Sequence, residues 1–266
     1  MKIFFSEFIP DYSSYFFPYQ VWLLKEEKED PEKIYENGFL PIRSLPKVYY
    51  LSRSLRVQLK EFALSSENKR ILKKTEFVSM KCFDLKSFPY SAEIQKFCKE
   101  YATQRLKGQL RSSSIRAIFL GEVFNYLLVF KDRRNQKNIG YAVCFNEENL
   151  LHYAHAFYDL NYFSCNLGAR MMLEAVIWAQ QNQKKFIYLG TCYESGAYYK
   201  TEFKGVEFFN GFTWSKNKEE LKFLLNLGQK DTNYDAYLFK RKEYLEKFYG
   251  NDIYTILNNF GVRVYF

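Results

Sequence analysis

The sequence predicts an α+β protein whose main part is a mixed sheet with flanking helices. Three strand-like runs, near residues 117–131, 138–145 and 150–158, follow one another across short turns, which favours an antiparallel meander. A segment at 166–182 then carries apolar residues at helical spacing and leads directly into a buried-looking strand at 186–190. This order predicts one sheet that is covered by helices.

The chain up to residue 80 predicts a small N-terminal α+β region. Residues 1–29 are rich in aromatic residues and read as irregular. Asp30-Pro31 supplies an N-cap and a first-turn proline for a short helix, which Asn37-Gly38 ends. Residues at 47–63 favour extended structure and lead to a second short helix.

Further helices complete the predicted organisation. Ser65 or Ser66 caps the second N-terminal helix. An amphipathic segment at 91–107 precedes the meander, and a helix near 217–227 ends at Gly228. The expected limits are 1–80 for the N-terminal region, 81–235 for the main domain and 236–266 for a C-terminal tail that packs on the core.

Composition and charge narrow the class of protein. Of the 266 residues, 47% are hydrophobic and 26% are charged, which is typical of a globular chain. The net charge of +9 fits nucleic acid, an anionic membrane surface or an acidic peptide as partner. Five cysteines without a C-x-x-C pair, and no secretory signal, predict free thiols in the cytoplasm. No stretch reaches the roughly 18 apolar residues of a membrane span, so we expect no membrane partner.

Several kinds of site are excluded by the motifs that the sequence lacks. The two histidines, His152 and His155, lie three apart on a predicted strand and should point to opposite faces, so no metal site is expected. There is no G-x-S-x-G elbow for a serine hydrolase. There is also no P-loop and no G-x-G-x-x-G nucleotide motif.

The segment that joins the third strand to the long helix is informative. A meander, a helix and then a strand form the core layout of a GNAT (GCN5-related N-acyltransferase-like) domain. Such a domain holds the CoA pyrophosphate on glycine-rich backbone amides at the start of this helix. Here the segment 164–170 reads SCNLGAR and contains one glycine, Gly168. The sequence therefore predicts a GNAT-like shape with a poor CoA site.

Short motifs occur in a fixed order between about residues 6 and 210. The motifs are Phe8-Ile9-Pro10, Leu55-Arg56-Val57, Glu61-Phe62, the basic run 69–74, Phe157-Tyr158-Asp159, Leu167-Gly168, Tyr188-Leu189-Gly190 and Tyr199-Lys200-x-x-Phe203. In order and spacing they resemble arginyl-tRNA–protein transferases and the bacterial aspartate/glutamate leucyltransferases. The resemblance makes 1–80 an N-terminal transferase region and 81–235 the GNAT-like catalytic domain.

The chain departs from this family in three places. Ser6 and Ser52 stand where the family's cysteines are expected, so we expect neither an iron–sulfur cluster nor haem. The stretch between Gly190 and Tyr199 is about two residues shorter than is usual, and Gly205 stands where the family has a proline. The chain therefore resembles a divergent branch of the family, and its acceptor and amino-acid specificity stay open.

The resemblance implies transfer of an amino acid, Arg or Leu, from tRNA to the N-terminal amine of a protein, as in N-end rule degradation. Aminoacyl-tRNA is then a co-substrate, and no further cofactor is expected. The reaction needs a neutral amine, whose reference pKa is about 7.7–8.0. It also needs donors for the developing oxyanion and positive charge that holds the tRNA. We expect a cytoplasmic monomer.

Three residues of these motifs are candidates for catalysis. Asp159, at a predicted strand end, could orient or deprotonate the amine, or could instead cap a helix or turn. Tyr158 and Tyr188 could position the aminoacyl group or relay a proton, or could be tyrosines of the core.

Other motif residues are candidates for binding. Gly190 could let the backbone approach the substrate, and Tyr199 could position the aminoacyl group. Lys200 could bind phosphate or an acidic acceptor residue, or could form an exposed salt bridge. Arg56 is a further candidate for substrate and tRNA contact. The predicted tRNA contacts on the second helix, which could alternatively be a solvated face, are Lys69, Arg70, Lys73 and Lys74.

Three other functions stay open at this point. A GNAT N-acetyltransferase would use acetyl-CoA, which the poor phosphate loop disfavours. A tRNA-dependent enzyme could instead use a non-protein acceptor, such as a peptidoglycan precursor or a small peptide. A non-catalytic RNA-binding protein would keep the transferase scaffold without transferring anything.

Overall fold

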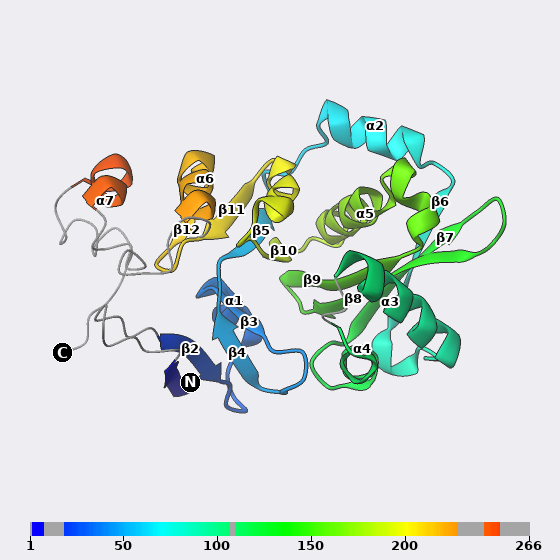
Figure 1. The fold of residues 1–266 in the computed structure, drawn as a ribbon, viewed down its shortest axis with the longest axis horizontal. Coiled ribbons are helices and arrows are strands. Elements are labelled where there is room, and N and C mark those ends of the chain that lie inside the picture. The colour runs from blue at the N-terminus through cyan, green and yellow to red at the C-terminus, as the bar shows by residue number, and fades with distance from the viewer. Residues whose placement is uncertain (1, 8–18, 107–109, 228–241, 251–266) are drawn as a thin grey trace.

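The computed structural model describes residues 2–7, 19–106, 110–227 and 242–250, which form two sheets and the helices around them (Figure 1). The large sheet runs in the order β12 (Trp214–Ser215), β11 (Val206–Phe209), β5 (Ser54–Gln58), β10 (Phe186–Thr191), β9 (Leu150–Tyr158), β8 (Asn138–Asn146), β7 (Tyr126–Asp132) and β6 (Val78–Asp84). Its neighbours are antiparallel except for β9 and β10, which are parallel.

The predicted core of the main domain is confirmed. The meander is present as β7, β8 and β9, and α5 (Leu167–Gln181) connects β9 to the parallel strand β10. Before β7 lies α3 (Ala92–Arg105), whose N-cap Ser91 accepts a hydrogen bond from the backbone N–H of Ile94. This element order, with its single parallel pair, makes the protein an α+β protein with a GNAT-like mixed sheet and flanking helices.

One predicted strand is wrong over half its length. The run at 117–131 begins within α4 (Ser112–Leu120), and only its second half is extended, as β7. Ile115, Ile118 and Phe119 are buried in α4 at helical spacing. A short apolar run that precedes a strand fits either structure, and here the packing of α4 against α3 decides it.

The N-terminal region also differs from the prediction. The stretch described as irregular contains β1 (Lys2–Glu7) and β2 (Tyr19–Leu24), which pair with each other. A small four-stranded sheet in the order β1-β2-β4-β3 is completed by β4 (Val48–Leu51) and β3 (Phe39–Pro41). Regular pairing was not predicted because these strands lack clean alternation of polar and apolar residues. The motif Phe8-Ile9-Pro10 lies outside the described residues.

The two short helices of this region form as predicted. The first, α1 (Pro31–Glu36), begins after Asp30, whose side chain accepts from the N–H of Glu32, and Gly38 follows at a φ of +81°. A Cβ on Gly38 would lie 2.2 Å from the Phe209 ring, so glycine also permits close packing there. The second, α2 (Ser66–Lys74), has a capping box between Ser65 and Asn68.

Limits were predicted at residues 80 and 235, of which residue 235 lies outside the described residues. Residue 80 lies inside β6, and β5 stands between β10 and β11, so the chain before and after this point shares one sheet. Towards the C-terminus, α6 (Lys218–Leu227) matches the predicted helix, while Gly228 lies outside the described residues. Of the predicted tail, α7 (Lys242–Phe248) packs on α6, where the buried Tyr244 donates to Glu220 Oε1 at 2.7 Å.

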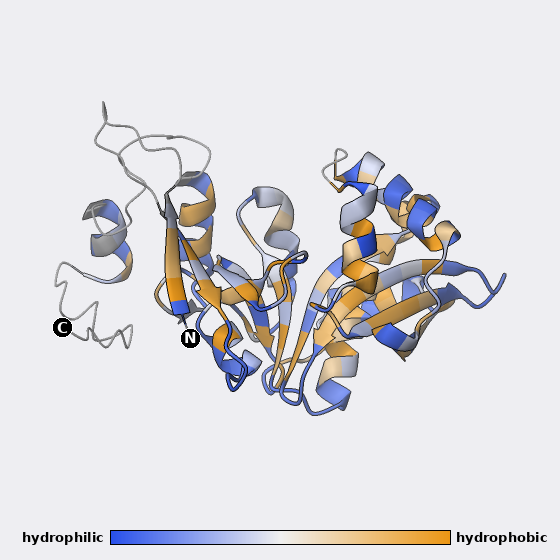
Figure 2. Cartoon of the chain, turned by 90° about the horizontal axis from the view of Figure 1, so that it is seen from below, coloured by the Kyte–Doolittle hydropathy of each residue, from blue (hydrophilic) through white to orange (hydrophobic). Residues whose placement is uncertain are grey.

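The faces of the large sheet have separate apolar cores. On one face, residues of α5, α2 and α6 pack against the strands. On the other face, α3 and α4 cover β7, β8 and β9, while the small sheet and α1 cover the start of β9 and β10. Figure 2 shows hydrophobic residues along the strands and hydrophilic residues on the loops and outer helix faces. Among the described residues, no helix is long and apolar enough to cross a membrane.

Candidate active site

The parallel strands β9 and β10 separate soon after they meet. Only three pairs join them, and the last is Tyr188 with His152. Beyond this point β9 continues to Tyr158, whereas β10 bends and pairs its Thr191 with Ser54 of β5. After His152, the edge of β9 that faces β10 is therefore no longer paired with β10. Backbone groups at such an edge can bind a carbonyl group of a substrate.

A β-bulge lies in the same part of β9. His155 pairs with Val143 while Tyr153 pairs with Cys144, so one extra residue, Ala154, is inserted into β9. The prediction that the two histidines point to opposite faces is therefore wrong. Both rings contact Phe124, with centroid distances of 6.4 Å for His152 and 5.2 Å for His155.

Both histidines are neutral at physiological pH. Burial lowers the pKa of His152 to about 3 and that of His155 to about 4. His152 is engaged in the core, since its Nδ1 lies 3.0 Å from the hydroxyl of Tyr35. Among the described residues, none forms a side-chain hydrogen bond with a ring nitrogen of His155. The described residues hold no group of three His, Cys, Asp or Glu side chains that could bind a metal ion.

Lys200 lies at the bend of β10. Its Nζ donates to the carbonyl oxygens of Leu189 at 2.9 Å and Thr191 at 3.3 Å. Gly190 between them has a φ of +77°, which favours glycine, and its nearest neighbour is Nζ, 3.7 Å from the position of a Cβ. Burial lowers the pKa of Lys200, and among the described residues its ammonium has no carboxylate partner. Gly190 permits this bend, and its predicted role in backbone approach to a substrate stays a prediction.

A cavity of about 250 Å³ opens at the start of α5, and we call it the α5 cavity. Tyr158 and Tyr199 line it, together with Arg105 from the end of α3. Gly168 of α5 allows Tyr158 to pack closely, because a Cβ there would lie 2.9 Å from the Tyr158 ring. The first N–H groups of a helix have no intrahelical partner, so this end of α5 and Arg105 both favour an anionic ligand. Phe163 completes one wall, under the guanidinium of Arg105 at 4.7 Å.

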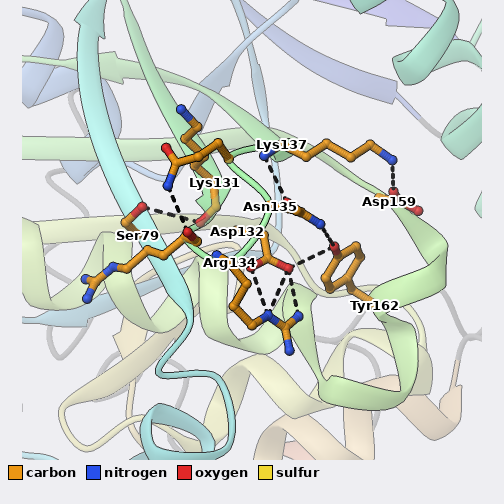
Figure 3. Close-up of polar contacts among 10 residues, drawn as sticks. Ser79, Lys131, Asp132, Arg134, Asn135, Lys137, Asp159 and Tyr162 are labelled. Carbon is orange, nitrogen blue, oxygen red and sulfur yellow. Dashed lines mark hydrogen bonds and ion pairs between the residues drawn. The ribbon is translucent and has the colours of Figure 1, made fainter.

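Asp159 has the contacts of a capping residue. Its side chain accepts from the backbone N–H of Asn161 at the start of the 3-10 turn η2 (Leu160–Cys165), and Lys137 Nζ lies 2.9 Å from its Oδ2 (Figure 3). Burial is the largest single effect and opposes ionisation, but the hydrogen bonds from Lys137 and Asn161 and the charge of Lys137 together outweigh it, so the pKa of Asp159 is lowered. Asp159 lines a separate cavity of about 240 Å³ that also includes Tyr158. This geometry supports the capping alternative better than a base that deprotonates the amine.

The turn η2 is tied to the β7–β8 hairpin. The Tyr162 hydroxyl donates to Asp132 Oδ2 at 2.9 Å, and Arg134 Nη2 donates to the same oxygen at 2.7 Å (Figure 3). The hydrogen bond from Arg134 holds the pKa of the buried Asp132 at about 2. Because η2 leads into α5 and contributes Phe163 to the α5 cavity, this network fixes one of its walls.

Arg56 and Tyr188 belong to the core. Arg56 Nε lies 2.5 Å from Glu207 Oε1, and its guanidinium lies between the rings of Phe186 and Trp214, at 4.0 and 3.8 Å. Arg56 Nη1 also donates to the hydroxyl of the fully buried Tyr188 at 3.3 Å. The prediction that Arg56 contacts tRNA does not fit this burial, because a phosphate group cannot reach the guanidinium. Tyr188 matches the alternative of a packed core tyrosine.

The basic residues of α2 are exposed near the α5 cavity. Ile71 is buried and anchors α2 on α5, whereas the predicted tRNA contacts on α2 all face solvent. Lys74 Nζ donates to the carbonyl of Ser164 in η2 at 2.7 Å, and Arg70 pairs with Glu67 on its own helix. The α2 residues in question are Lys69, Arg70, Lys73 and Lys74. They place positive charge beside η2 and the start of α5. Figure 1 shows α2 lying next to α5.

Sequence reasoning missed three residues of this region. Arg105 is a single charge at a helix end, and Tyr101 and Tyr153 look like ordinary core positions. The rings of Tyr101 and Tyr158 lie 4.9 Å apart, and Tyr153 is fully enclosed near both. The bulge in β9, which breaks the alternation of side chains after Tyr153, leaves no mark in the sequence pattern.

Comparisons with known proteins give only distant likenesses. No protein-family model matches the chain, and no curated protein matches it. Among solved structures, it is similar to the C-terminal domain of a putative lysylphosphatidylglycerol synthetase from Agrobacterium fabrum, with 9% identity over 53% of this chain and 46% of that one and a TM-score of 0.39. It is also similar to L-PGS from Bacillus licheniformis, with 11% identity over 62% of this chain and 52% of that one and a TM-score of 0.37. A structure of FemX is similar with 8% identity over 61% of this chain and 59% of that one, and the TM-score is 0.39.

The match thus spans about half the length of these three structures, between 46% and 59%. The class that the topology defines is a GNAT-like fold, in which β9 and β10 separate beside the start of α5. The narrower resemblance to arginyl-tRNA–protein transferases rests on the sequence motifs.

Proposed function

We propose that the protein transfers an amino acid from aminoacyl-tRNA to the N-terminal amine of a protein, at the point where β9 and β10 separate. The observation that carries this proposal is the arrangement around the α5 cavity. The start of α5, Arg105 and the exposed basic face of α2 lie together near the end of β9. This is the arrangement that a large polyanionic donor with a reactive ester at its end requires.

The donor would enter along α2. The basic residues of α2 would contact tRNA phosphates, and Arg105 with the start of α5 would hold the phosphates nearest the 3′ end. Tyr158 and Tyr199 would position the terminal nucleotide and the aminoacyl group. The ester carbonyl would then lie at the unpaired edge of β9, where backbone N–H groups can stabilise the oxyanion.

The chemistry is an acyl transfer without a redox step. The nitrogen of a neutral amine attacks the ester carbon, and a C–N bond forms. The tetrahedral intermediate collapses with cleavage of the C–O bond to the ribose, and the proton released by the nitrogen ends on the freed tRNA hydroxyl. Lys200 holds the carbonyls of Leu189 and Thr191 and so maintains the bend that keeps β10 away from β9.

Acetyl-CoA is a poorer fit to the same site. The helix start has one glycine, Gly168, and the Tyr158 ring packs against it. The close approach of a pyrophosphate to several consecutive amides is therefore restricted. This favours a donor that is held mainly by side-chain charge.

A transfer assay tests the proposal. Purified protein is mixed with a pool of radiolabelled aminoacyl-tRNAs and peptides that differ in their first residue, and a parallel reaction contains labelled acetyl-CoA. We expect label to pass from tRNA to peptide. Transfer from acetyl-CoA alone would refute the proposal, and tRNA binding without transfer would indicate the non-catalytic alternative. Transfer to peptidoglycan precursors but not to peptides would indicate a non-protein acceptor.

Variants connect the reaction to the site. Lys200→Met removes both hydrogen bonds that hold the bend of β10. We expect the backbone at the bend to shift and kcat to fall by about 100-fold, the size of the loss when reacting atoms are misaligned by about 1 Å. Lys81→Met is the matched control, since Lys81 is exposed on β6, at the edge of the sheet far from the bend. Equal kcat in the two variants would contradict the assigned role of Lys200.

A further inference from the structure

We propose that a second cavity, at the far end of α5, binds one unpaired nucleotide of the RNA donor, with Phe186 against the base and Lys60 and Lys185 on its phosphate. This inference rests on the proposed function and adds to it a contact that is distant from the reacting atoms. The cavity has a volume of about 450 Å³ and lies where β5 and α5 end and β10 begins. We call it the nucleotide cavity. Its lining includes Gln58, Lys60, Gln180, Lys184, Lys185 and Phe186.

The nucleotide cavity and the α5 cavity lie at opposite ends of α5. In the last turn of α5, Gln180 Nε2 donates to the carbonyl oxygens of Leu59 at 2.9 Å and Phe62 at 3.0 Å. At the other end, Lys74 Nζ donates to the carbonyl of Ser164, just before α5. The helix α2 therefore runs along α5 from one cavity towards the other (Figure 1). The fifteen residues of α5 span about 22 Å at about 1.5 Å per residue.

Positive charge continues from α2 into the nucleotide cavity. The exposed basic residues of α2 lie between the two cavities, so an RNA that follows them from the α5 cavity arrives at Lys60 and Lys185. Both lysines are exposed, and neither has a carboxylate partner among the described residues. The neighbouring Glu61 pairs with Lys216 instead, at 2.6 Å. Two ammonium groups without countercharge favour a phosphate at this place.

The third lysine of the cavity is less available to an anion. Lys184 Nζ donates to the carbonyl of Glu147, and burial lowers the pKa of this lysine. The carboxylates of Glu147, Glu32 and Glu148 lie close enough to raise the same pKa, so they compensate its charge. The phosphate is therefore expected at the two exposed lysines.

The remaining walls suit a flat base. Phe186 is partly exposed, and the Arg56 guanidinium lies over its ring at 4.0 Å. The part of the ring that the guanidinium leaves open stacks on a base, a contact that tolerates any base. The Nε2 atom of Gln58 donates to Glu207 and that of Gln180 to backbone carbonyls, and within the described part of the chain no group donates to either Oε1. The N–H groups of a base are donors for such oxygens.

The size of the cavity selects a single nucleotide. Ligand sites commonly have volumes of about 300–1,000 Å³, and this cavity lies at the lower end of that range. A base inside a duplex is stacked between its neighbours and cannot enter, so the nucleotide has to be unpaired. The chemistry that fits is a planar base with a phosphate, whether the nucleotide belongs to an RNA or is free.

Binding of uncharged tRNA tests the inference without any transfer. In filter binding, Lys60→Gln/Lys185→Gln should reduce the slope of log Kobs against log salt by about 1.4, since each single-strand phosphate contact contributes about 0.7. Phe186→Leu keeps an apolar side chain and should weaken binding about tenfold with an unchanged slope. Lys81→Gln/Lys86→Gln is the matched control, because both lysines are exposed at the other edge of the sheet.

Titration calorimetry distinguishes the two sources of the nucleotide. Adenosine monophosphate, cytidine monophosphate and inorganic phosphate are titrated separately into the wild type and the variants. Weaker tRNA binding in the variants supports the RNA source. Binding of a free nucleotide that is lost in the variants, with tRNA binding unchanged, would overturn the RNA source and leave a site for free nucleotides. Unchanged tRNA binding with no nucleotide binding, or binding of phosphate alone, would overturn the nucleotide cavity.

Two controls keep the test decisive. Thermal melting verifies that each variant is folded, and Lys60→Gln/Lys185→Gln, which changes only exposed side chains, suffices if Phe186→Leu does not fold. The transfer assay separates the inference from the proposed function. Wild-type protein that binds tRNA through the cavity but transfers nothing would refute the proposed function alone. Transfer in the wild type, with unchanged tRNA binding in both variants and no nucleotide binding, would refute the nucleotide cavity alone.

Discussion

Substitution of Arg56 separates a structural role from a role in tRNA binding. The Arg56 guanidinium is 2.5 Å from Glu207 Oε1 and is enclosed by two aromatic rings, so Arg56→Met leaves a buried carboxylate without its countercharge. Loss of one partner of a buried ion pair costs about 3–5 kcal/mol. Methionine has a similar length and fills the space between the rings, so little apolar packing is lost. Gln58 Nε2 still donates to Glu207 Oε2 at 2.8 Å, which places the expected loss in the lower part of this range.

Urea unfolding followed by tryptophan fluorescence measures this loss. The double variant Arg56→Met/Glu207→Gln removes the uncompensated charge and should recover most of the lost stability. Filter binding of tRNA, performed where Arg56→Met is folded, should give the wild-type Kd and the wild-type salt dependence. An Arg56→Met variant with full stability, weaker tRNA binding and a smaller salt slope would refute the structural assignment and restore Arg56 as a phosphate contact.

Three further predictions concern α2, the hairpin network and the bend of β10. Substitution of the four exposed basic residues of α2 by glutamine should reduce the slope of log Kobs against log salt for tRNA binding by about 3. Filter binding at increasing salt concentration measures this slope, and an unchanged slope would exclude α2 as a tRNA contact. The pKa of Asp132 is held at about 2, so its carboxylate stabilises the fold fully above about pH 4, the unfolded value, and this stabilisation is lost as the pH falls through about 2. The melting temperature of Asp132→Asn should therefore fall less than that of the wild type between these pH values, and parallel curves would contradict this. Gly190→Ala should cost about 1–2 kcal/mol in chemical unfolding because its φ is +77°, whereas Gly196→Ala, which meets no atom within 4 Å and has no positive φ, should be close to neutral.

Local chemistry made several elements predictable. Asp30, Pro31 and Gly38 act within one or two turns of α1, and the Ser65 cap of α2 likewise depends on residues three positions apart. The helix at 166–182 could be predicted because its apolar spacing persists over four turns, where a strand would need alternation. The run at 117–131 failed because its first half is short and uniformly apolar, so only packing against α3 assigns it to a helix.

The candidate site was predictable in part. The motifs drew attention to Tyr158, Gly190, Tyr199 and Lys200, which the structure places around the separated strands, while their roles stay predictions. They could not distinguish these from Arg56, because a basic residue in a strand has the same sequence signature whether it is buried against Glu207 or exposed to a phosphate. His155 was set aside because strand periodicity places it opposite His152, and that periodicity is broken by the bulge at Ala154.

The sequence by itself determined the order of the last two meander strands, the long helix and the strand after it, the caps of α1 and α2, the GNAT-like class of the fold and the basic character of α2. These properties arise from contacts between residues close together in the chain or from composition. The tertiary structure alone decided that β5 enters the large sheet, that β9 and β10 separate after His152, and that two cavities flank the bulged strand. Each of these depends on pairing between distant segments, whose register is set by the packing of both faces of the sheet and not by any local pattern.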